Sequence, residues 1–172
     1  MLPRQQPFSA TTSLRTALRA GGVEREADRI FSTCPSLRTV ALQFCRFVSP
    51  FIELESGENL LEKAMADAVC GFGAHESQDV RVAIKVFIEA LASHVDGLCG
   101  IRLSVQDDNG DWQIWQYDEP VFDWMAEHGR KAVLIRHRDE KLAKGPVLIK
   151  LLSYICKVRD LQMAHLNLAH LI

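Results

Sequence analysis

The 172-residue sequence contains none of the short motifs that identify common enzyme or cofactor sites. It has no glycine-rich phosphate loop, no His-Glu-x-x-His pattern and no Cys-x-x-Cys pair, so neither nucleotide binding nor zinc chemistry is indicated. No stretch approaches the roughly 18 consecutive apolar residues of a membrane-spanning helix. The first residues also lack the apolar core of a secretory signal. We therefore expect no enzyme activity, no cofactor, no metal and no membrane association.

The cysteines give no support for a disulfide framework. They are odd in number and scattered along the chain, and three of them lie inside apolar helical patterns. The five are Cys34, Cys45, Cys70, Cys99 and Cys156. Free, mostly buried thiols are typical of proteins in a reducing compartment, so we predict a cytoplasmic protein.

The net charge of −2 favours neither nucleic acid nor a membrane surface, but the charges are unevenly distributed. Residues 1–52 contain seven arginines and three acidic residues, residues 53–127 four basic and sixteen acidic residues, and residues 128–172 nine basic and three acidic residues. Solvated faces of an ordinary domain are the simpler explanation. The alternative is that the basic ends and the acidic middle attract each other, within one chain or between copies.

Hydrophobic periodicity predicts one α+β domain over residues 1–172, with helix predominating. Residues 1–11 are expected to form an N-terminal arm, and residues 12–98 a helical part. Residues 99–138 fit a small ββαβ antiparallel unit, and residues 146–172 a long C-terminal helix.

The helical part is expected to contain four helices before a central one. They are predicted at residues 13–20, at residues 24–32, from a Ser36 N-cap to the stop at Pro50, and at residues 58–70 with Ser56 as the cap. Gly71-Phe72-Gly73 is then expected to break the chain.

A central, buried helix is predicted over residues 77–98. Ser77 is its expected cap and Gly97 its end. Only Arg81, Lys85 and Glu89 form a polar stripe. The other positions are largely apolar, and a helix of this kind is normally buried on several sides.

The spacing changes after Gly100, where apolar and polar residues alternate as in a strand. Residues 107–111 are rich in Asp, Asn and Gly and predict a hairpin turn. A two-residue Asn109-Gly110 turn would pair Val105 with Ile114, whereas a three-residue turn with Gly110 at a bulge would pair Leu103 with Trp115. The two registers send the aromatic side chains to opposite faces, and we favour the two-residue turn. A helix at residues 119–127 and a strand at residues 131–138 follow.

Four aromatic residues within a short stretch form the candidate partner-binding site. Trp and Tyr are enriched at the energetic centres of protein interfaces, although they also serve as ordinary core residues between a sheet and a helix. The residues are Trp112, Trp115, Tyr117 and Trp124.

The C-terminal helix carries a candidate self-association seam. Apolar residues repeat every seven positions from Leu151 onward, at spacings typical of a helical seam, although packing within the same chain explains the first half slightly better. The seam comprises Tyr154, Val158, Leu161, His165, Leu168 and Ile172, and it predicts a homo-oligomer.

Weaker patterns allow two other classes of function. The spacing of Ala17 and Gly21, followed by Val23 and Ile30, loosely resembles a helix-turn-helix, and nearby arginines add positive charge. Acidic residues at the start of the second helix would, however, repel phosphate. His94 and Cys99 are close in sequence, as a cysteine nucleophile and its base would need, but do not share a helical face. Asp107, Asp108 and Asp111 are oxygen-rich but lack calcium-loop spacing.

An intracellular protein that acts by binding another protein is therefore the preferred functional prediction. It would be a regulator, inhibitor, chaperone or assembly subunit. A DNA-binding regulator is the alternative, and a cysteine-dependent enzyme comes third. The sequence does not specify the partner.

Overall fold

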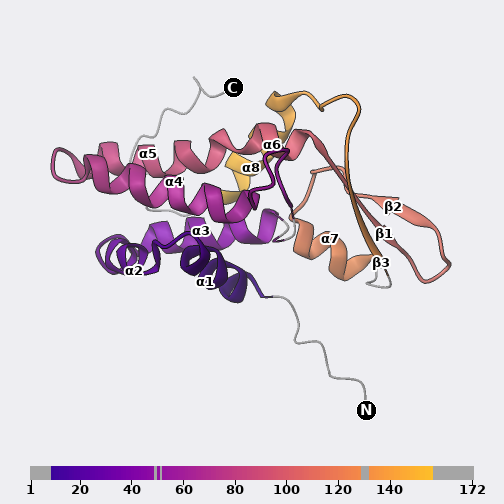
Figure 1. The fold of residues 1–172 in the computed structure, drawn as a ribbon, viewed down its shortest axis with the longest axis horizontal. Helices are drawn as coiled ribbons and strands as arrows, with labels where there is room; N and C mark the ends of the chain where they lie inside the picture. Colours follow the sequence, from indigo (N-terminus) through magenta and orange to yellow (C-terminus); the bar gives the residue numbers. More distant parts are fainter. Residues whose placement is uncertain (1–8, 49, 51, 129–131, 157–172) are drawn as a thin grey trace, which may run out of the picture.

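The computed structural model describes residues 9–48, 50, 52–128 and 132–156, and it confirms the predominantly helical α+β fold. Most of its helices form one end of the molecule, and a small sheet with one short helix beside it projects from the other end (Figure 1). The elements in chain order are α1 (Ala10–Ala20), α2 (Glu24–Thr33), α3 (Pro35–Phe47), α4 (Leu60–His75), α5 (Val80–Ser93), α6 (Val95–Cys99), β1 (Ile101–Gln106), β2 (Trp112–Ile114), α7 (Val121–Glu127), β3 (Ala132–His137) and α8 (Lys144–Ile155).

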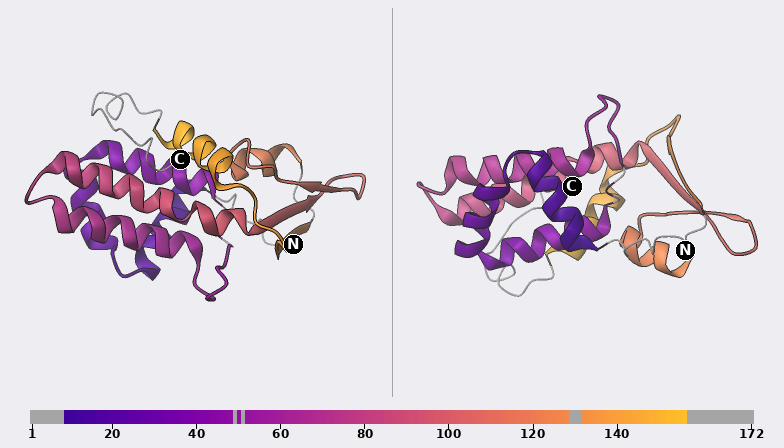
Figure 2. Two further views of the ribbon diagram at one scale, coloured as in Figure 1. Left: turned by 90° about the horizontal axis from the view of Figure 1, so that it is seen from above. Right: turned by 60° about the horizontal axis from the view of Figure 1, so that its bottom comes forward.

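The helices form two layers, with α4 and α5 antiparallel and side by side over α1, α2 and α3 (Figures 1 and 2). Helix α8 packs against α3, α5 and α6. The core runs continuously from the helices into the sheet, because buried apolar side chains of every element except β2 and β3 belong to one cluster. None of the helices in the described ranges has the length and apolar character needed to cross a bilayer.

Helix α2 begins at Glu24 as predicted, whereas α1 and α3 begin at residues other than those predicted. Helix α1 begins inside the predicted arm, because the hydroxyl of Ser9 accepts a hydrogen bond from the backbone N–H of Thr12 at 3.1 Å. It ends as predicted at the double glycine, where Gly22 has a φ of +70°. The predicted Ser36 cap is wrong. Helix α3 begins at Pro35, whose fixed φ suits the first turn, so Ser36 lies inside the helix.

Helix α4 differs from the prediction in its N-cap and in its end. Its cap is Asn59 and not Ser56, because the Asn59 side chain accepts from the N–H groups of Leu61 at 3.0 Å and Glu62 at 3.1 Å. The helix also continues through Gly71 and Gly73 to His75, although we expected these glycines to break it.

The predicted central helix is central, but its boundaries were wrong. Asp79 caps α5, and the chain breaks at His94 before the short α6. His94 Nε2 lies 2.9 Å from Asp67 Oδ2 of α4, so this break is tied to the neighbouring helix. Phe87 is buried, whereas Val80 at the start of α5 is exposed.

The sheet has the order β2-β1-β3, and both pairings are antiparallel. Trp115 N–H donates to the Leu103 carbonyl at 3.0 Å, so the preferred register was wrong and the three-residue turn is correct. Asp107 explains this choice. Its Oδ1 accepts from the N–H groups of Asn109 and Asp111, both at 2.9 Å, and Gly110 takes a φ of +90°.

A buried tyrosine fixes the junction between the helices and the sheet. Tyr117 has a φ of +62°, and its hydroxyl donates to the carbonyls of Leu98, at 2.7 Å, and Ile101. Its ring lies 4.2 Å from that of Trp115, centre to centre. Burial raises the pKa of Tyr117 to about 12, and nearby Arg138 opposes that rise.

The predicted seam of the C-terminal helix can be followed only at its start. Leu151 is buried, and the Tyr154 ring lies 6.1 Å from that of Phe47, so this part packs within its own chain. The remaining seam residues lie outside the described residues, and self-association through them stays a prediction. They are Val158, Leu161, His165, Leu168 and Ile172.

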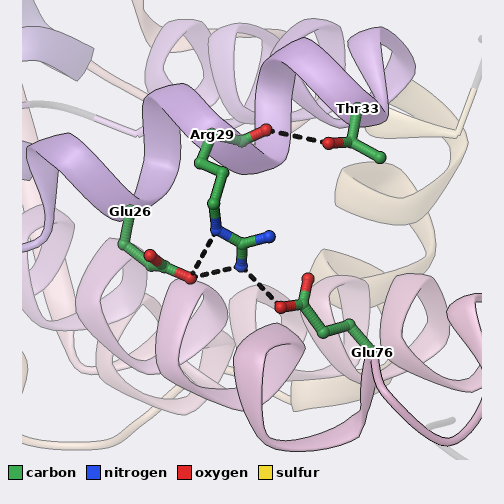
Figure 3. A network of polar contacts seen from close by, with 4 residues as sticks. All are labelled: Glu26, Arg29, Thr33 and Glu76. Carbon is green, nitrogen blue, oxygen red and sulfur yellow. Dashed lines mark hydrogen bonds and ion pairs between the residues drawn. The ribbon is translucent and has the colours of Figure 1, made fainter.

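Ion pairs within the chain link its basic ends to its acidic middle. Arg46 pairs with Asp123 at 2.6 Å, and Lys141 pairs with Asp96 at 3.0 Å. Arg29 of α2 binds Glu26 on its own helix and reaches Glu76 beyond α4, at 2.6 Å (Figure 3). All three lie at the surface, where such pairs contribute little to stability. The attraction that we gave as the alternative therefore exists within the chain but does not determine the fold.

Candidate protein-binding surface

Only one of the four predicted partner-binding aromatics is accessible. Trp115, Tyr117 and Trp124, which we expected at a partner-binding surface, are buried and belong to the core. Trp112 keeps 48% of its surface exposed. Trp112 and Trp115 lie on opposite faces in either register, and the three-residue turn places Trp115 on the core face with Leu103 and leaves Trp112 on the other face.

One face of the sheet is covered and the other is open. Ile101, Leu103 and Val105 of β1 point into the core and are buried together with Trp115. The intervening positions of β1 and their partners point the other way. Trp112 lies beside Gln106, and Ser104 lies between Ile114 and Leu134.

A hollow of about 300 Å³ lies on this open face, which we call the open sheet face. It is lined by Arg102, Ser104, Trp112, Leu134 and Arg136. Ser104 forms its floor and is buried by the larger side chains around it. The hollow therefore combines an aromatic side chain, an aliphatic side chain and two cations.

The two cations are placed unusually. Arg102 and Arg136 are directly opposite each other on β1 and β3. Like charges at directly opposed positions destabilise a sheet. Within the described residues, neither guanidinium forms an ion pair with a carboxylate of this chain. An external carboxylate placed over the pair would remove this repulsion.

The sequence pointed to only part of this surface. It singled out Trp112, but Arg102, Arg136, Ile114 and Leu134 were not among the predicted site residues. The alternation of β1 placed Arg102 and Ser104 on the outward face. The juxtaposition with Arg136 depends on the pairing of β1 with β3, which no short-range pattern specifies.

The predicted Cys99–His94 pair does not form a nucleophilic site. Cys99 is buried, and burial raises the pKa of its thiol, with a further contribution from Asp96. His94 instead contacts Asp67. The buried thiol therefore has, among the described residues, neither the access nor the base that a cysteine nucleophile requires.

The other weak candidates have structural explanations. No group of three or more metal-ligating side chains is found in the described part of the chain. Asp107 is occupied by turn hydrogen bonds, which account for the acidic hairpin tip. Of the arginines near the double glycine, Arg19 pairs with Glu24 at 3.2 Å and Arg29 with Glu26 and Glu76, which leaves less positive charge for phosphate.

Comparison with protein-family models, curated proteins and solved structures finds no match to this chain. The functional conclusion therefore depends on the surface chemistry described above.

Proposed function

We propose that this chain acts by binding another protein, and that the open sheet face is its contact surface. The observation that carries the proposal is the exposed Trp112 beside a hollow lined by Leu134 and two opposed arginines. Trp and Arg are the residues most enriched at the energetic centres of protein interfaces. The small sheet would serve as the binding element, and the helices as its support, in a regulator, inhibitor, chaperone or assembly subunit.

The charge pattern favours a protein over a nucleic acid. Trp112 directly follows the hairpin tip, which carries Asp107, Asp108 and Asp111. These carboxylates would repel a phosphate backbone that stacked a base on Trp112. A protein partner could instead place an apolar side chain against Trp112 and a carboxylate beside the two arginines of the open sheet face.

The five cysteines agree with the predicted cytoplasmic location. All are free thiols, and Cys45 and Cys99 are buried. We infer a reducing compartment from this, since oxidising compartments favour disulfides.

A matched pair of variants tests the proposal. Tagged wild type, Trp112→Ala and Ile149→Ala are used to capture partners from the native cell, with quantitative mass spectrometry as readout. Ile149 of α8 is a control of equal exposure, at 49% against 48% for Trp112. We expect a protein that is retained by wild type and by Ile149→Ala but lost with Trp112→Ala.

Two further results bear on the outcome. Unfolding in urea should show similar stabilities for the two alanine variants, because both positions are exposed. A double charge reversal, Arg102→Glu with Arg136→Glu, should also release the captured protein. Equal capture by all variants would contradict a contact through the open sheet face.

A further inference from the structure

Strand β3 forms an edge of the sheet whose outer side has no strand partner in the described chain. Among the described residues, the sheet ends at β3, which pairs with β1 alone. Arg138 N–H donates to the Gly100 carbonyl at 2.8 Å, just beyond the strand. Because hydrogen-bonded pairs alternate along an antiparallel ladder, the even-numbered residues of β3 bond to β1. The backbone groups of Val133, Ile135 and His137 therefore point outward.

The first four residues of β3 lack the features that normally prevent strand addition, and Arg136 comes only after them. Protected edges are short, bulged, or carry proline or charge within the strand. The opposite edge, β2, is only three residues long, whereas β3 has six. Its first four residues are apolar and include no proline. Val133 points to the core side of the sheet but keeps 42% of its surface exposed, so the core does not cover this edge.

The charges that flank the apolar residues of β3 indicate which kind of strand would pair with its edge. Arg136 and His137 end β3, and Arg138 follows. In the sequence, Arg130 and Lys131 directly precede it. Antiparallel pairing with a second copy of β3, centred on Ile135, would place Leu134 opposite Arg136 and supply no carboxylate there, so a second copy would leave this charge unpaired.

We propose that β3 accepts an extended segment of a partner protein as an additional strand, and that this segment has a short aliphatic stretch flanked by acidic residues. This inference rests on the proposed protein-binding function and specifies how the partner is held. Backbone hydrogen bonds to Val133, Ile135 and His137 would supply affinity, and side chains would supply specificity. An acidic residue opposite Arg136 would lie on the open sheet face next to Arg136, with Arg102 one strand further away on β1.

Two variants at one position separate backbone pairing from side-chain contact. Val133→Pro removes an outward N–H, at an edge position where proline leaves the β1 ladder intact. Val133→Thr is its matched control, because it keeps the N–H and a β-branched side chain of similar size. Both should remain folded, since Val133 is exposed, and this is checked by circular dichroism.

The probe is a labelled synthetic peptide, Glu-Asp-Val-Thr-Val-Thr-Asp-Glu, with Lys-Lys-Val-Thr-Val-Thr-Lys-Lys as the charge control. Fluorescence anisotropy should show binding of the acidic peptide to wild type and to Val133→Thr. It should show binding weakened about tenfold or more by Val133→Pro, through the lost hydrogen bond and the bulk of the ring. The basic peptide should not bind. Amide exchange followed by NMR should show new protection at Ile135 and His137.

Several results would overturn the proposal. They are no binding of the acidic peptide, equal binding by Val133→Pro, equal binding of the basic peptide, or preference for a single-stranded oligonucleotide. The capture experiment with Trp112→Ala is independent of these. If the peptide fails but capture still depends on Trp112, strand addition is wrong while the protein-binding function stands. If capture does not depend on Trp112, the proposed contact through the open sheet face is wrong, whatever the result with the peptide.

Discussion

Two glycines of α4, two positions apart, should respond to alanine with opposite signs. Both lie inside the helix, where replacing glycine by alanine ordinarily stabilises by about 1 kcal/mol. Their surroundings differ. A Cβ on Gly71 would lie 2.9 Å from Cγ1 of Val86 on α5, whereas a Cβ on Gly73 would find its nearest neighbour, a Glu26 carboxylate oxygen, at 3.9 Å.

The balance at each position follows from these distances. Val86 is short and β-branched, so it has little freedom to move aside, and overpacking of this kind costs about 1–3 kcal/mol. We expect Gly71→Ala to lower the free energy of unfolding by about 1 kcal/mol after its gain in helix propensity is included. Gly73→Ala should raise it by about 0.5–1 kcal/mol.

Urea unfolding followed by circular dichroism measures both variants, and a third variant tests the cause. Adding Val86→Ala to Gly71→Ala removes the steric conflict, so the two substitutions together should cost less than the sum of their separate effects. If Gly71→Ala stabilises as much as Gly73→Ala, the close approach of α4 and α5 is not set by this glycine.

Three other substitutions test the core, the junction and the hairpin. Phe87→Ala should destabilise by about 3–5 kcal/mol in urea, because the ring is buried and lies 6.4 Å from that of Phe31; a loss below about 1 kcal/mol would contradict a central α5. Tyr117→Phe should cost about 1–3 kcal/mol at neutral pH, since the Leu98 carbonyl loses its hydroxyl donor. Because the folded-state pKa of Tyr117 is raised from 10.0 to about 12, the stabilisation by its hydroxyl should be complete below pH 10 and decline towards pH 12. A stability difference between wild type and Tyr117→Phe that stays constant from pH 10 to pH 12 would contradict this role of the hydroxyl. Gly110→Val should lower the melting temperature, because a β-branched side chain resists the φ of +90°, and an unchanged value would count against this turn.

Local patterns predicted the type of nearly every element, because they depend on residues close in sequence. The alternation through Ile101, Leu103 and Val105 predicted β1, and the double glycine correctly predicted the end of α1. Helix caps were less predictable. Several residues near each start have capping side chains, and small geometric differences selected Asn59 over Ser56 and Asp79 over Ser77.

Features that depend on tertiary contacts were the ones that sequence reasoning missed. Gly71 looked like a helix breaker, but the approach of α5 makes a small residue necessary there. The hairpin register depended on the side chain of Asp107, which satisfies two backbone N–H groups in the longer turn. Of the aromatic cluster, only Trp112 remained a surface residue, because that register buried its neighbours.

The strand order also has a consequence for synthesis of the chain. Strand β1 is made first but occupies the centre of the sheet, and its second partner, β3, follows only after β2 and α7. Until β3 emerges from the ribosome, the hairpin has the even-numbered side of β1 unpaired, beside the apolar side chains of Ile101 and Leu103. A nascent chain of this length exposes an aggregation-prone edge of β1, which β3 covers in the folded protein. Translation pauses between α7 and β3 should therefore increase its demand for chaperones.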